Sequence, residues 1–279
     1  MAVMTVTVAG VADTMKIRDY MKFRLGFSSS LIGKVKYGGV TLNGEVVHMR
    51  ATVKNGDVIA VRYPEENSEN VQPMDIPLTV LYEDEAILAV DKGQNMPIHP
   101  SRGNHLPTLA NAVSYYMGSR FVFRAITRLD RDTSGVVLIA KNQLAAAVLG
   151  REIMAGGMEK IYHARVVGVP EPREGEIAAP IARECEESLK RVVREDGKDS
   201  LTRYRVLSVD GEGNALVEAI PVTGRTHQIR VHMAHIGHPL KDDFLYGSQA
   251  GDALYSLRCV SLTFTHPVTG ERMTVKALP

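Results

Sequence analysis

The sequence contains no tryptophan and only two cysteines, Cys185 and Cys259. They lie far apart and no Cys-x-x-Cys motif is present, so neither a disulfide framework nor a cysteine-based zinc site is encoded. No apolar run approaches the roughly 18 residues of a membrane span. The apolar start of the chain follows no positive charge, unlike a secretion signal. These absences predict a mature, cytoplasmic protein that does not enter a membrane.

The composition is otherwise that of an ordinary globular protein. Of 279 residues, 44% are apolar, and the 24 glycines and 13 prolines follow no repeat. This composition excludes disordered and collagen-like chains. At roughly 150 residues per domain, the length predicts about two domains.

The net charge is only +1, but the charges are unevenly distributed. Residues 1–63 have a net charge of +5, whereas residues 64–86 contain seven acids and no base. The expected organisation is a basic head (1–63), an acidic and solvated linker (64–75) and a larger body (76–279). A concentrated positive charge indicates a nucleic-acid partner, although a basic surface without a partner is the alternative.

Turn and helix signals divide the head into short elements. The expected elements are a helix over Met15–Leu25 capped by Asp13 or Thr14, a second helix after Ser28, a hairpin over Val40–Val47 turning at Asn43-Gly44, and a strand over Val58–Val61. Two short basic helices followed by small strands resemble the S4 type of RNA-binding domain.

In the body, apolar runs typical of strands outnumber helical patterns. Strands are expected at Leu78–Tyr82, Ala86–Val90, Val122–Ile126, Val136–Ala140, Tyr162–Val167, Thr202–Val209, Ala215–Pro221, Ser261–Thr265 and Met273–Ala277, and helices at Leu109–Met117, Leu144–Ala155 and Thr226–Ile236. Several strands follow one another without a helix between them. This favours an α+β fold with a mixed, largely antiparallel sheet.

A charged loop, Thr127 to Gly135, lies between two of these apolar strands. Asp130 and Asp132, flanked by Arg128 and Arg131, are candidates for a nucleophile, a base or a metal ligand. The same residues also suit an ordinary turn capped by side chains.

The helix expected after the cap Thr226 carries four histidines within or beside it. Their spacing is poor for zinc, because no His-Glu-x-x-His motif and no nearby cysteine is present. Histidines that bond the backbone are therefore the better interpretation. Arg225 and Arg230, near the helix N-terminus, are suited to binding an anion such as phosphate.

Lys160 and Tyr162 project to the same face of an expected strand. A strand tyrosine by itself most often serves packing.

Together these residues resemble the RluA-type family of pseudouridine synthases. The matching blocks are Arg128-Leu-Asp130-x-x-Thr-Ser-Gly135, Lys160-x-Tyr162, Gly224-Arg-Thr-His-Gln-Ile-Arg230, Gly237-His-Pro-Leu240 and Asp243-x-x-Tyr246-Gly247. The chain departs from the family pattern at Thr127, where histidine is usual, and at Asp242, where glycine is usual. Glycine permits any backbone angle, so Asp242 adds a restriction there.

The resemblance implies a pseudouridine synthase fold preceded by an S4-like domain, and an isomerase that needs no cofactor. It implies that Asp130 is catalytic, either attacking the ribose or removing the proton at its carbon 2. Arg230 would pair with Asp130, and Tyr162 would help remove the proton at carbon 5 of the turned base. Arg128 would fill the space of the displaced nucleotide. Lys160, Arg225 and His227 would contact the pocket or the RNA.

The expected substrate is structured RNA, with large-subunit ribosomal RNA favoured over tRNA because the basic head suits a large RNA. The enzyme is expected to be a monomer without an obligate protein partner. The alternatives are a tRNA pseudouridine synthase and a non-catalytic RNA-binding or ribosome assembly protein. A glycoside hydrolase is disfavoured, because no second carboxylate pair is evident.

Overall fold

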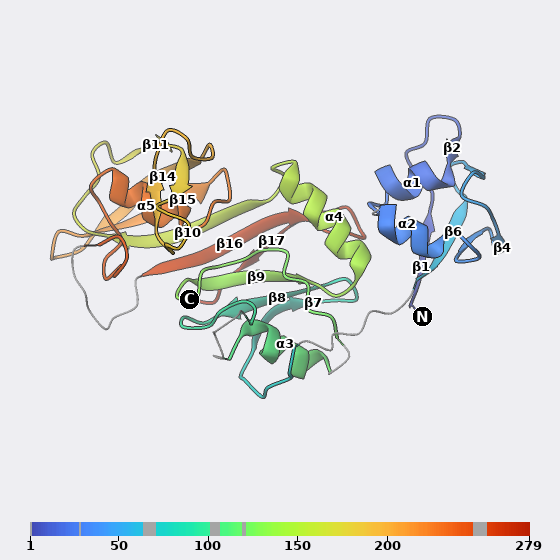
Figure 1. Ribbon diagram of the computed structural model, residues 1–279, viewed down its shortest axis with the longest axis horizontal. Helices are drawn as coiled ribbons and strands as arrows, with labels where there is room; N and C mark the ends of the chain where they lie inside the picture. Colours follow the sequence, from blue (N-terminus) through green and yellow to red (C-terminus); the bar gives the residue numbers. More distant parts are fainter. Residues whose placement is uncertain (1, 28, 64–70, 101–106, 119–120, 248–255) are drawn as a thin grey trace.

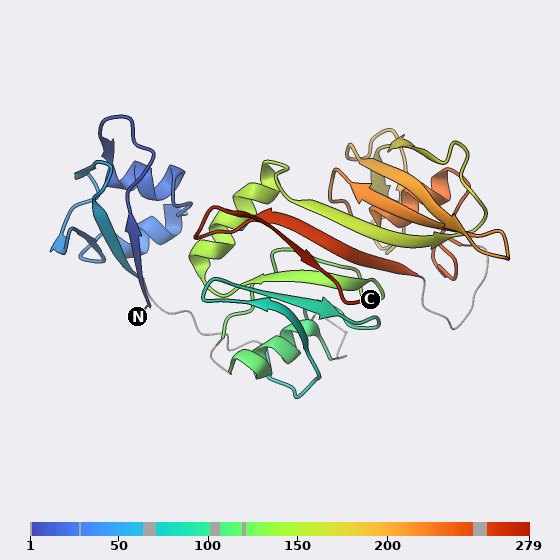
Figure 2. The same ribbon diagram turned by 180° about the vertical axis from the view of Figure 1, so that it is seen from behind.

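The computed structural model describes residues 2–27, 29–63, 71–100, 107–118, 121–247 and 256–279. A small N-terminal head lies at one end of an elongated body (Figures 1 and 2). None of the helices in these ranges combines the length and the apolar character needed to cross a bilayer.

The head is a small α+β unit. Its elements are β1 (Ala2–Thr7), β2 (Met15–Lys16), α1 (Ile17–Phe23), α2 (Ser29–Val35), β3 (Val40–Leu42), β4 (Glu45–Val46), β5 (Thr52–Val53) and β6 (Val58–Tyr63). Four strands form a sheet in the order β1-β6-β3-β4, and β2 pairs with β5. The predicted hairpin is present, because Asn43 and Gly44 adopt φ of 50° and 90°.

The predicted capping of the first head helix by Asp13 or Thr14 is wrong. The helix begins at Ile17, and Lys16 precedes it without a side-chain cap. The N–H groups of Ile17 and Arg18 instead donate to the carbonyls of Ala51 and Met49. Tertiary backbone contacts therefore satisfy donors that a side chain normally satisfies.

The body contains a nine-stranded sheet in the order β11-β14-β15-β10-β16-β9-β8-β7, with β17 paired to β16. Its elements are β7 (Thr79–Glu83), β8 (Ile87–Lys92), α3 (Leu109–Met117), β9 (Ser134–Ala140), α4 (Gln143–Met154), β10 (Glu159–Val166), β11 (Glu174–Ala178), β12 (Ile181–Arg183), β13 (Arg191–Val193), β14 (Leu201–Val209), β15 (Ala215–Pro221), α5 (Gln228–His235), β16 (Leu257–Thr265) and β17 (Arg272–Lys276). β16 and β9 run parallel, and the other paired strands are antiparallel. The predicted α+β class with a mixed, largely antiparallel sheet is confirmed.

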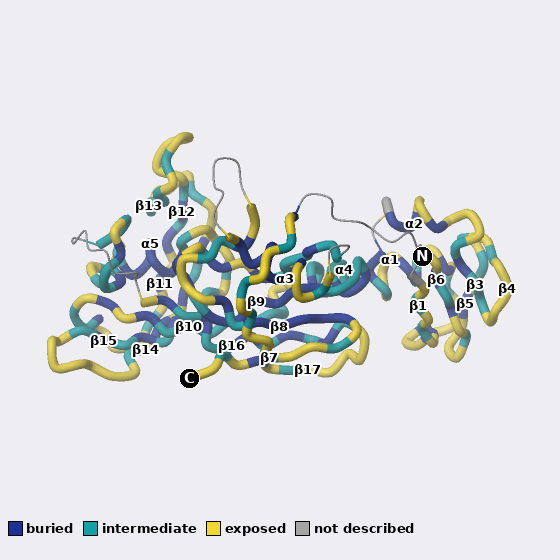
Figure 3. Tube along the Cα trace, turned by 90° about the horizontal axis from the view of Figure 1, so that it is seen from below, coloured by how far each residue is buried: buried dark blue, intermediate teal, exposed yellow. Residues whose placement is uncertain are grey.

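The helices α3, α4 and α5 lie on one side of this sheet (Figure 3). β8 and β9 are almost completely buried, as their continuous apolar runs require. A separate two-stranded sheet, β12 and β13, lies on the same side as α5. These strands of three residues each were not predicted.

The predicted strand over Val122–Ile126 is wrong. The segment runs beside β9 and makes a single bridge, between Ala125 and Ile139. The N–H groups of Ile126 and Thr127 both donate to the Leu138 carbonyl, so the ladder stops there. The chain then turns into the charged loop that was predicted to carry chemistry.

Part of the expected linker packs against the body. Residues 64–70 lie outside the described residues, but Val71 is buried in the body's core. The Asn111 side chain of α3 donates to the Gln72 carbonyl at 2.7 Å. The packed body therefore begins earlier than the expected boundary at residue 76.

Candidate active site

The seven residues to which the family resemblance gives a role all line one cavity of about 460 Å³, whereas the other candidate carboxylate, Asp132, does not. They come from three separate places in the fold: the loop before β9, the strand β10, and the first turn of α5 with the residues that lead into it. The residues are Arg128, Asp130, Lys160, Tyr162, Arg225, His227 and Arg230. The fold therefore brings together segments that lie far apart in the sequence.

The loop that carries Asp130 is held by the buried side chain of Lys92, at the end of β8. The Lys92 ammonium donates to the carbonyls of Gly93, Met96 and Arg131 at 2.8, 2.9 and 2.9 Å. Burial lowers the pKa of Lys92 to about 8, and the carboxylates of Asp132 and Asp130 oppose this effect. Lys92 was not among the predicted site residues; its signal in the sequence is a lysine that ends an apolar strand.

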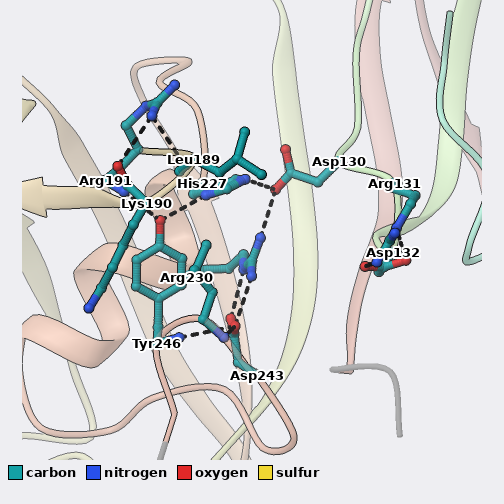
Figure 4. A network of polar contacts seen from close by, with 11 residues as sticks. Asp130, Arg131, Asp132, Leu189, Lys190, Arg191, His227, Arg230, Asp243 and Tyr246 are labelled. Atoms are coloured by element: carbon teal, nitrogen blue, oxygen red, sulfur yellow. Dashed lines mark hydrogen bonds and ion pairs between the residues drawn. The ribbon is translucent and has the colours of Figure 1, made fainter. Parts of the chain in front are cut away.

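Asp130 and Asp132 have different surroundings. Asp132 is buried and accepts two hydrogen bonds of 2.9 Å from the guanidinium of Arg131. Asp130 is partly exposed at the cavity, and its carboxylate points toward Arg230 and His227 (Figure 4). Asp130 is thus positioned to meet a ligand, whereas Asp132 stabilises the loop.

Gly135 begins the close approach of β9 to β16. It has φ of 111°, and a Cβ atom there would collide with the Cys259 carbonyl. Glycine is therefore required by both the backbone angle and the space.

Arg230 is buried in α5 and contacts two carboxylates. Its Nε and Nη2 donate to Asp243 at 2.7 and 2.8 Å, whereas its Nη1 lies 3.7 Å from Oδ2 of Asp130. The expected pairing with Asp130 is present, but the stronger, bidentate partner is Asp243. Asp243 matched the family motif, but its contact with Arg230 was not predicted.

The turn before α5 places His227 beside Asp130. His227 precedes the helix with φ of 58°, and no side chain caps the helix there, so the predicted cap at Thr226 is wrong. The side chain of Gln228 folds back instead, and its Oε1 accepts the N–H of Arg225 and the hydroxyl of Thr223. These two hydrogen bonds, and not a cap at Thr226, set the turn before the helix.

The imidazole of His227 bridges Tyr246 and Asp130. Its Nδ1 lies 2.7 Å from the Tyr246 hydroxyl, and its Nε2 lies 3.9 Å from Oδ2 of Asp130. The Tyr246 oxygen accepts the N–H of Arg191, so its own proton is available for Nδ1. Burial, and then the positive charges of Arg230 and Arg191, lower the pKa of His227 against the effect of Asp130.

Lys160 and Tyr162 enter the cavity from β10. Burial raises the pKa of Tyr162 well above its ordinary value of 10.0, and the neighbouring Cys259 and Asp130 add to this. Burial also lowers the pKa of Lys160. Tyr162 is therefore a neutral phenol near pH 7, and it needs a partner before it can accept a proton.

The two other arginines of the site lie at the rim. Arg128 is exposed, and Arg225 is held by a hydrogen bond of 3.1 Å from its Nε to the Asp199 carbonyl. Both are suited to contact phosphate or stacked bases.

His232 has the structural role that the sequence favoured for the histidines of this helix. It is fully buried, with Nδ1 2.9 Å from the Thr202 hydroxyl and Nε2 2.9 Å from the Ala179 carbonyl. Within the described ranges, no three side chains of metal-binding type gather as they would around an ion.

Comparison with known proteins gives consistent matches. Residues 86–235 match the family described as RNA pseudouridylate synthase. The "Uncharacterized RNA pseudouridine synthase YjbO" of Bacillus subtilis is 36% identical over 270 residues, covering 94% of this chain and 95% of the relative. The "Ribosomal large subunit pseudouridine synthase D" of Xanthomonas campestris is 37% identical over 270 residues, covering 90% and 81%.

A solved structure supports the same relationship. "Human RNA Pseudouridylate Synthase Domain Containing 1" superposes with a TM-score of 0.62 and 28% identity. The match covers 73% of this chain and 84% of that chain.

Proposed function

Because the chain belongs to the RluA-type family of RNA pseudouridine synthases, and is thus an isomerase that converts uridine to pseudouridine, we propose that its substrate is large-subunit ribosomal RNA and that Asp130 is the catalytic residue. Relatives from Xanthomonas campestris and Pseudomonas aeruginosa, both named ribosomal large subunit pseudouridine synthase D, support the substrate class. The observation that carries the catalytic assignment is the carboxylate of Asp130, which faces the cavity 3.7 Å from Nη1 of Arg230.

The reaction breaks the bond between ribose carbon 1 and the base nitrogen, turns the base over, and joins ribose to carbon 5. Asp130 begins it by attacking ribose carbon 1 or by removing the proton at carbon 2. Both routes use a carboxylate oxygen of Asp130, and Nη1 of Arg230 faces that carboxylate at 3.7 Å. Arg230 itself is held by Asp243, so its direction is set before RNA binds.

Tyr162 acts at the end of the reaction. After the new carbon–carbon bond forms, carbon 5 carries a hydrogen that must leave as a proton. The phenol oxygen of Tyr162 is within the same cavity as Asp130 and is suited to pass this proton on. Because its pKa is raised, Tyr162 is a neutral phenol and acts as part of a relay. Its oxygen takes the proton from carbon 5 while its own hydroxyl proton passes to the carboxylate of Asp130, which is free again once ribose is joined to carbon 5.

The target uridine must leave its stack before the ribose reaches Asp130. Arg128, exposed at the cavity rim, is suited to stack in the space that the uridine vacates. Lys160, Arg225 and His227 line the cavity and bind the extruded nucleotide. Their contacts orient the base while it turns.

The head, residues 1–63, supplies further RNA-binding surface as an S4-like domain. Lysines lie next to aromatic rings at the end of α1 and in the turn after α2: the Lys22 ammonium lies 5.4 Å from the ring centre of Phe23, and that of Lys36 lies 4.5 Å from that of Tyr37. Phe23 and Tyr37 are 61% and 83% exposed, which is high for such large rings. A basic surface with exposed rings suits binding to phosphates and unstacked bases. The cytoplasm is the compartment we assign, and both cysteines are free.

The test is to map pseudouridines in total RNA from cells that lack the protein. We expect one or more sites in large-subunit ribosomal RNA to be lost, and to return with the purified enzyme but not with Asp130→Asn. The variant should retain RNA binding while its rate falls by several powers of ten. Asp196→Asn, which changes an exposed carboxylate outside the cavity, serves as the control. Loss of sites only in tRNA would overturn the substrate, and full activity of Asp130→Asn would overturn the catalytic assignment.

A further inference from the structure

One face of α4 is covered by the head and not by the body. Leu144 and Val148 pack into the hydrophobic core of the head, and Leu144 is buried there. Arg151 extends the same stripe, since the three residues follow the spacing i, i+4, i+7. Ala145 and Leu149, one position further along, pack into the core of the body. α4 thus contributes to two cores at once.

Arg151 ties this helix to the C-terminus of α1. Its Nη1 donates to the carbonyl of Phe23 at 3.0 Å and lies 3.5 Å from that of Lys22. Carbonyls at the end of a helix carry partial negative charge, so a guanidinium is a favourable partner. Gly26 provides the space, because a Cβ atom there would collide with the guanidinium. The contact therefore depends on Arg151 in the body and on Gly26 in the head.

The two residues that follow Arg151 point to two other parts of the molecule. Oε1 of Glu152 accepts the N–H of Thr265 at 2.7 Å and Nη1 of Arg272 at 2.8 Å, which fixes the helix to β16 and β17. Ile153 lines the cavity that contains Asp130. Three successive residues therefore connect the head, the central sheet and the cavity.

We propose that Arg151 is a specificity-determining residue, because it holds the head in one orientation relative to the cavity. The RNA element bound by the head then lies at a set distance and direction from Asp130. The enzyme selects uridines that occupy this position in a folded RNA, beyond any recognition of the nucleotide in the cavity. The inference rests on the proposed RNA-binding role of the head.

The geometry explains why a remote contact affects selection. Small displacements of bound substrate cost large factors in rate, of the order of 100-fold for about 1 Å. A head released from α4 still binds RNA, but its orientation relative to the cavity varies. Many different uridines of the bound RNA, and not one particular uridine, then reach the cavity. A short RNA that fits the cavity without reaching the head is not affected.

The experiment uses the full chain with two interface variants. Arg151→Lys keeps the charge but loses the guanidinium nitrogen Nη1 that reaches the carbonyls of Lys22 and Phe23. Val148→Gln disturbs the same interface without adding charge. Arg173→Lys, at an exposed position on the body, is the control. Each protein is tested on full-length ribosomal RNA from cells lacking the enzyme and on a short fragment containing the same uridine. A dye pair on the native Cys185, which is exposed, and on Glu45→Cys in the head reports their distance.

We expect both interface variants to broaden the distance distribution and to lower the preference for the main uridine in long RNA by about 10-fold or more. Turnover of the short fragment should stay within about two-fold of the parent. The proposal would be overturned if the distance distribution did not change in the interface variants. It would also be overturned if the distribution broadened but the preference for the main uridine stayed the same, or if turnover of the short fragment fell as much as turnover of the long RNA. If the parent modifies no ribosomal RNA, the proposed substrate is wrong, and the same comparison is then made on the RNA that it does modify.

Discussion

Arg230 makes its two short hydrogen bonds to Asp243, and Asp130 lies one ångström further from the same guanidinium, at 3.7 Å compared with 2.7 Å. Asp243 is completely buried, whereas the Asp130 side chain is 29% exposed. The buried carboxylate therefore holds the arginine in place, and the exposed one is left with oxygen atoms available for the substrate. This separation of roles explains how one guanidinium supports a reactive carboxylate without neutralising it in a closed salt bridge.

Asp243→Asn should be strongly destabilising. It leaves the buried guanidinium without its main anionic partner, and removing one member of a buried pair costs about 3–5 kcal/mol. Chemical denaturation should show that loss, and the rate of pseudouridine formation should fall with it. Asp242→Gly is the matched control: Asp242 has φ of 64°, an angle that glycine adopts easily, so its stability should change by no more than about 1 kcal/mol. Equal stability of the Asp243 variant and the parent would contradict this account of Arg230.

Lys92→Met should lower kcat more than it changes KM. The substitution keeps the length of the side chain but leaves the carbonyls of Gly93, Met96 and Arg131 without their donor, and each buried unsatisfied group costs about 1–3 kcal/mol. The loop would relax and Asp130 would lose its position. Lys241→Met, which breaks an exposed salt bridge to Glu212, is the control and should cost at most about 1 kcal/mol. A parental kcat in the Lys92 variant would show that the loop is held by other contacts.

Local signals in the sequence predicted some elements very closely. The helix Leu109–Met117 was predicted at its observed bounds, and the structure shows that Thr108 and Asn111 close its N-terminus with a capping box, a contact between residues three apart in the sequence. The caps of α1 and α5 were predicted wrongly, because contacts with other parts of the chain determine how these helices begin. The backbone carbonyls of Met49 and Ala51, just before β5, accept the first N–H groups of α1. The folded-back side chain of Gln228 shapes the turn before α5. Neither contact can be derived from spacing.

The candidate active site also depends on contacts that the sequence alone does not reveal. The spacing of Asp130, Tyr162 and Arg230 does not indicate that they share a cavity, and family resemblance supplied that expectation. The roles of Lys92 and Asp243 depend on a buried ammonium reaching three carbonyls and on a bidentate ion pair, which exist only in the folded chain. Asp242 is a partial exception, since the sequence predicted a backbone restriction there and the residue adopts a positive φ.

Tyr162→Phe should slow the final proton transfer and spare RNA binding. Removal of a general acid–base group typically costs 10²- to 10⁴-fold in rate. With RNA carrying deuterium at carbon 5 of uridine, the variant should show a larger isotope effect than the parent, because proton loss becomes the slow step. Tyr204→Phe, which removes a hydroxyl bonded to the Pro172 carbonyl outside the cavity, is the control. An isotope effect that stays unchanged in the Tyr162 variant would remove Tyr162 from this step.

The positive surface of the head should appear in the salt dependence of RNA binding. Each cation that neutralises an RNA phosphate contributes about 0.7 to 0.9 to the slope of log affinity against log salt. Lys22→Gln with Lys36→Gln should therefore reduce the slope by about 1.5 on long RNA. Arg173→Gln with Lys276→Gln removes the same charge from the body and should change the slope much less. Equal slopes for the two pairs would mean that the head is not the RNA-binding surface.

His227 should make the folded protein less stable as the pH falls. Its pKa lies below the ordinary value of 6.5, chiefly through burial, so the unfolded chain binds the proton at a higher pH than the folded chain does. The stability that this residue contributes is therefore present above pH 6.5 and is lost as the pH falls through the folded pKa. His227→Asn keeps a residue that tolerates the observed φ of 58° but cannot titrate. Denaturation between pH 7.5 and 5 should show a steeper loss of unfolding free energy in the parent than in the variant. The other histidines are common to both proteins, so parallel curves would show that His227 is not held neutral beside Asp130.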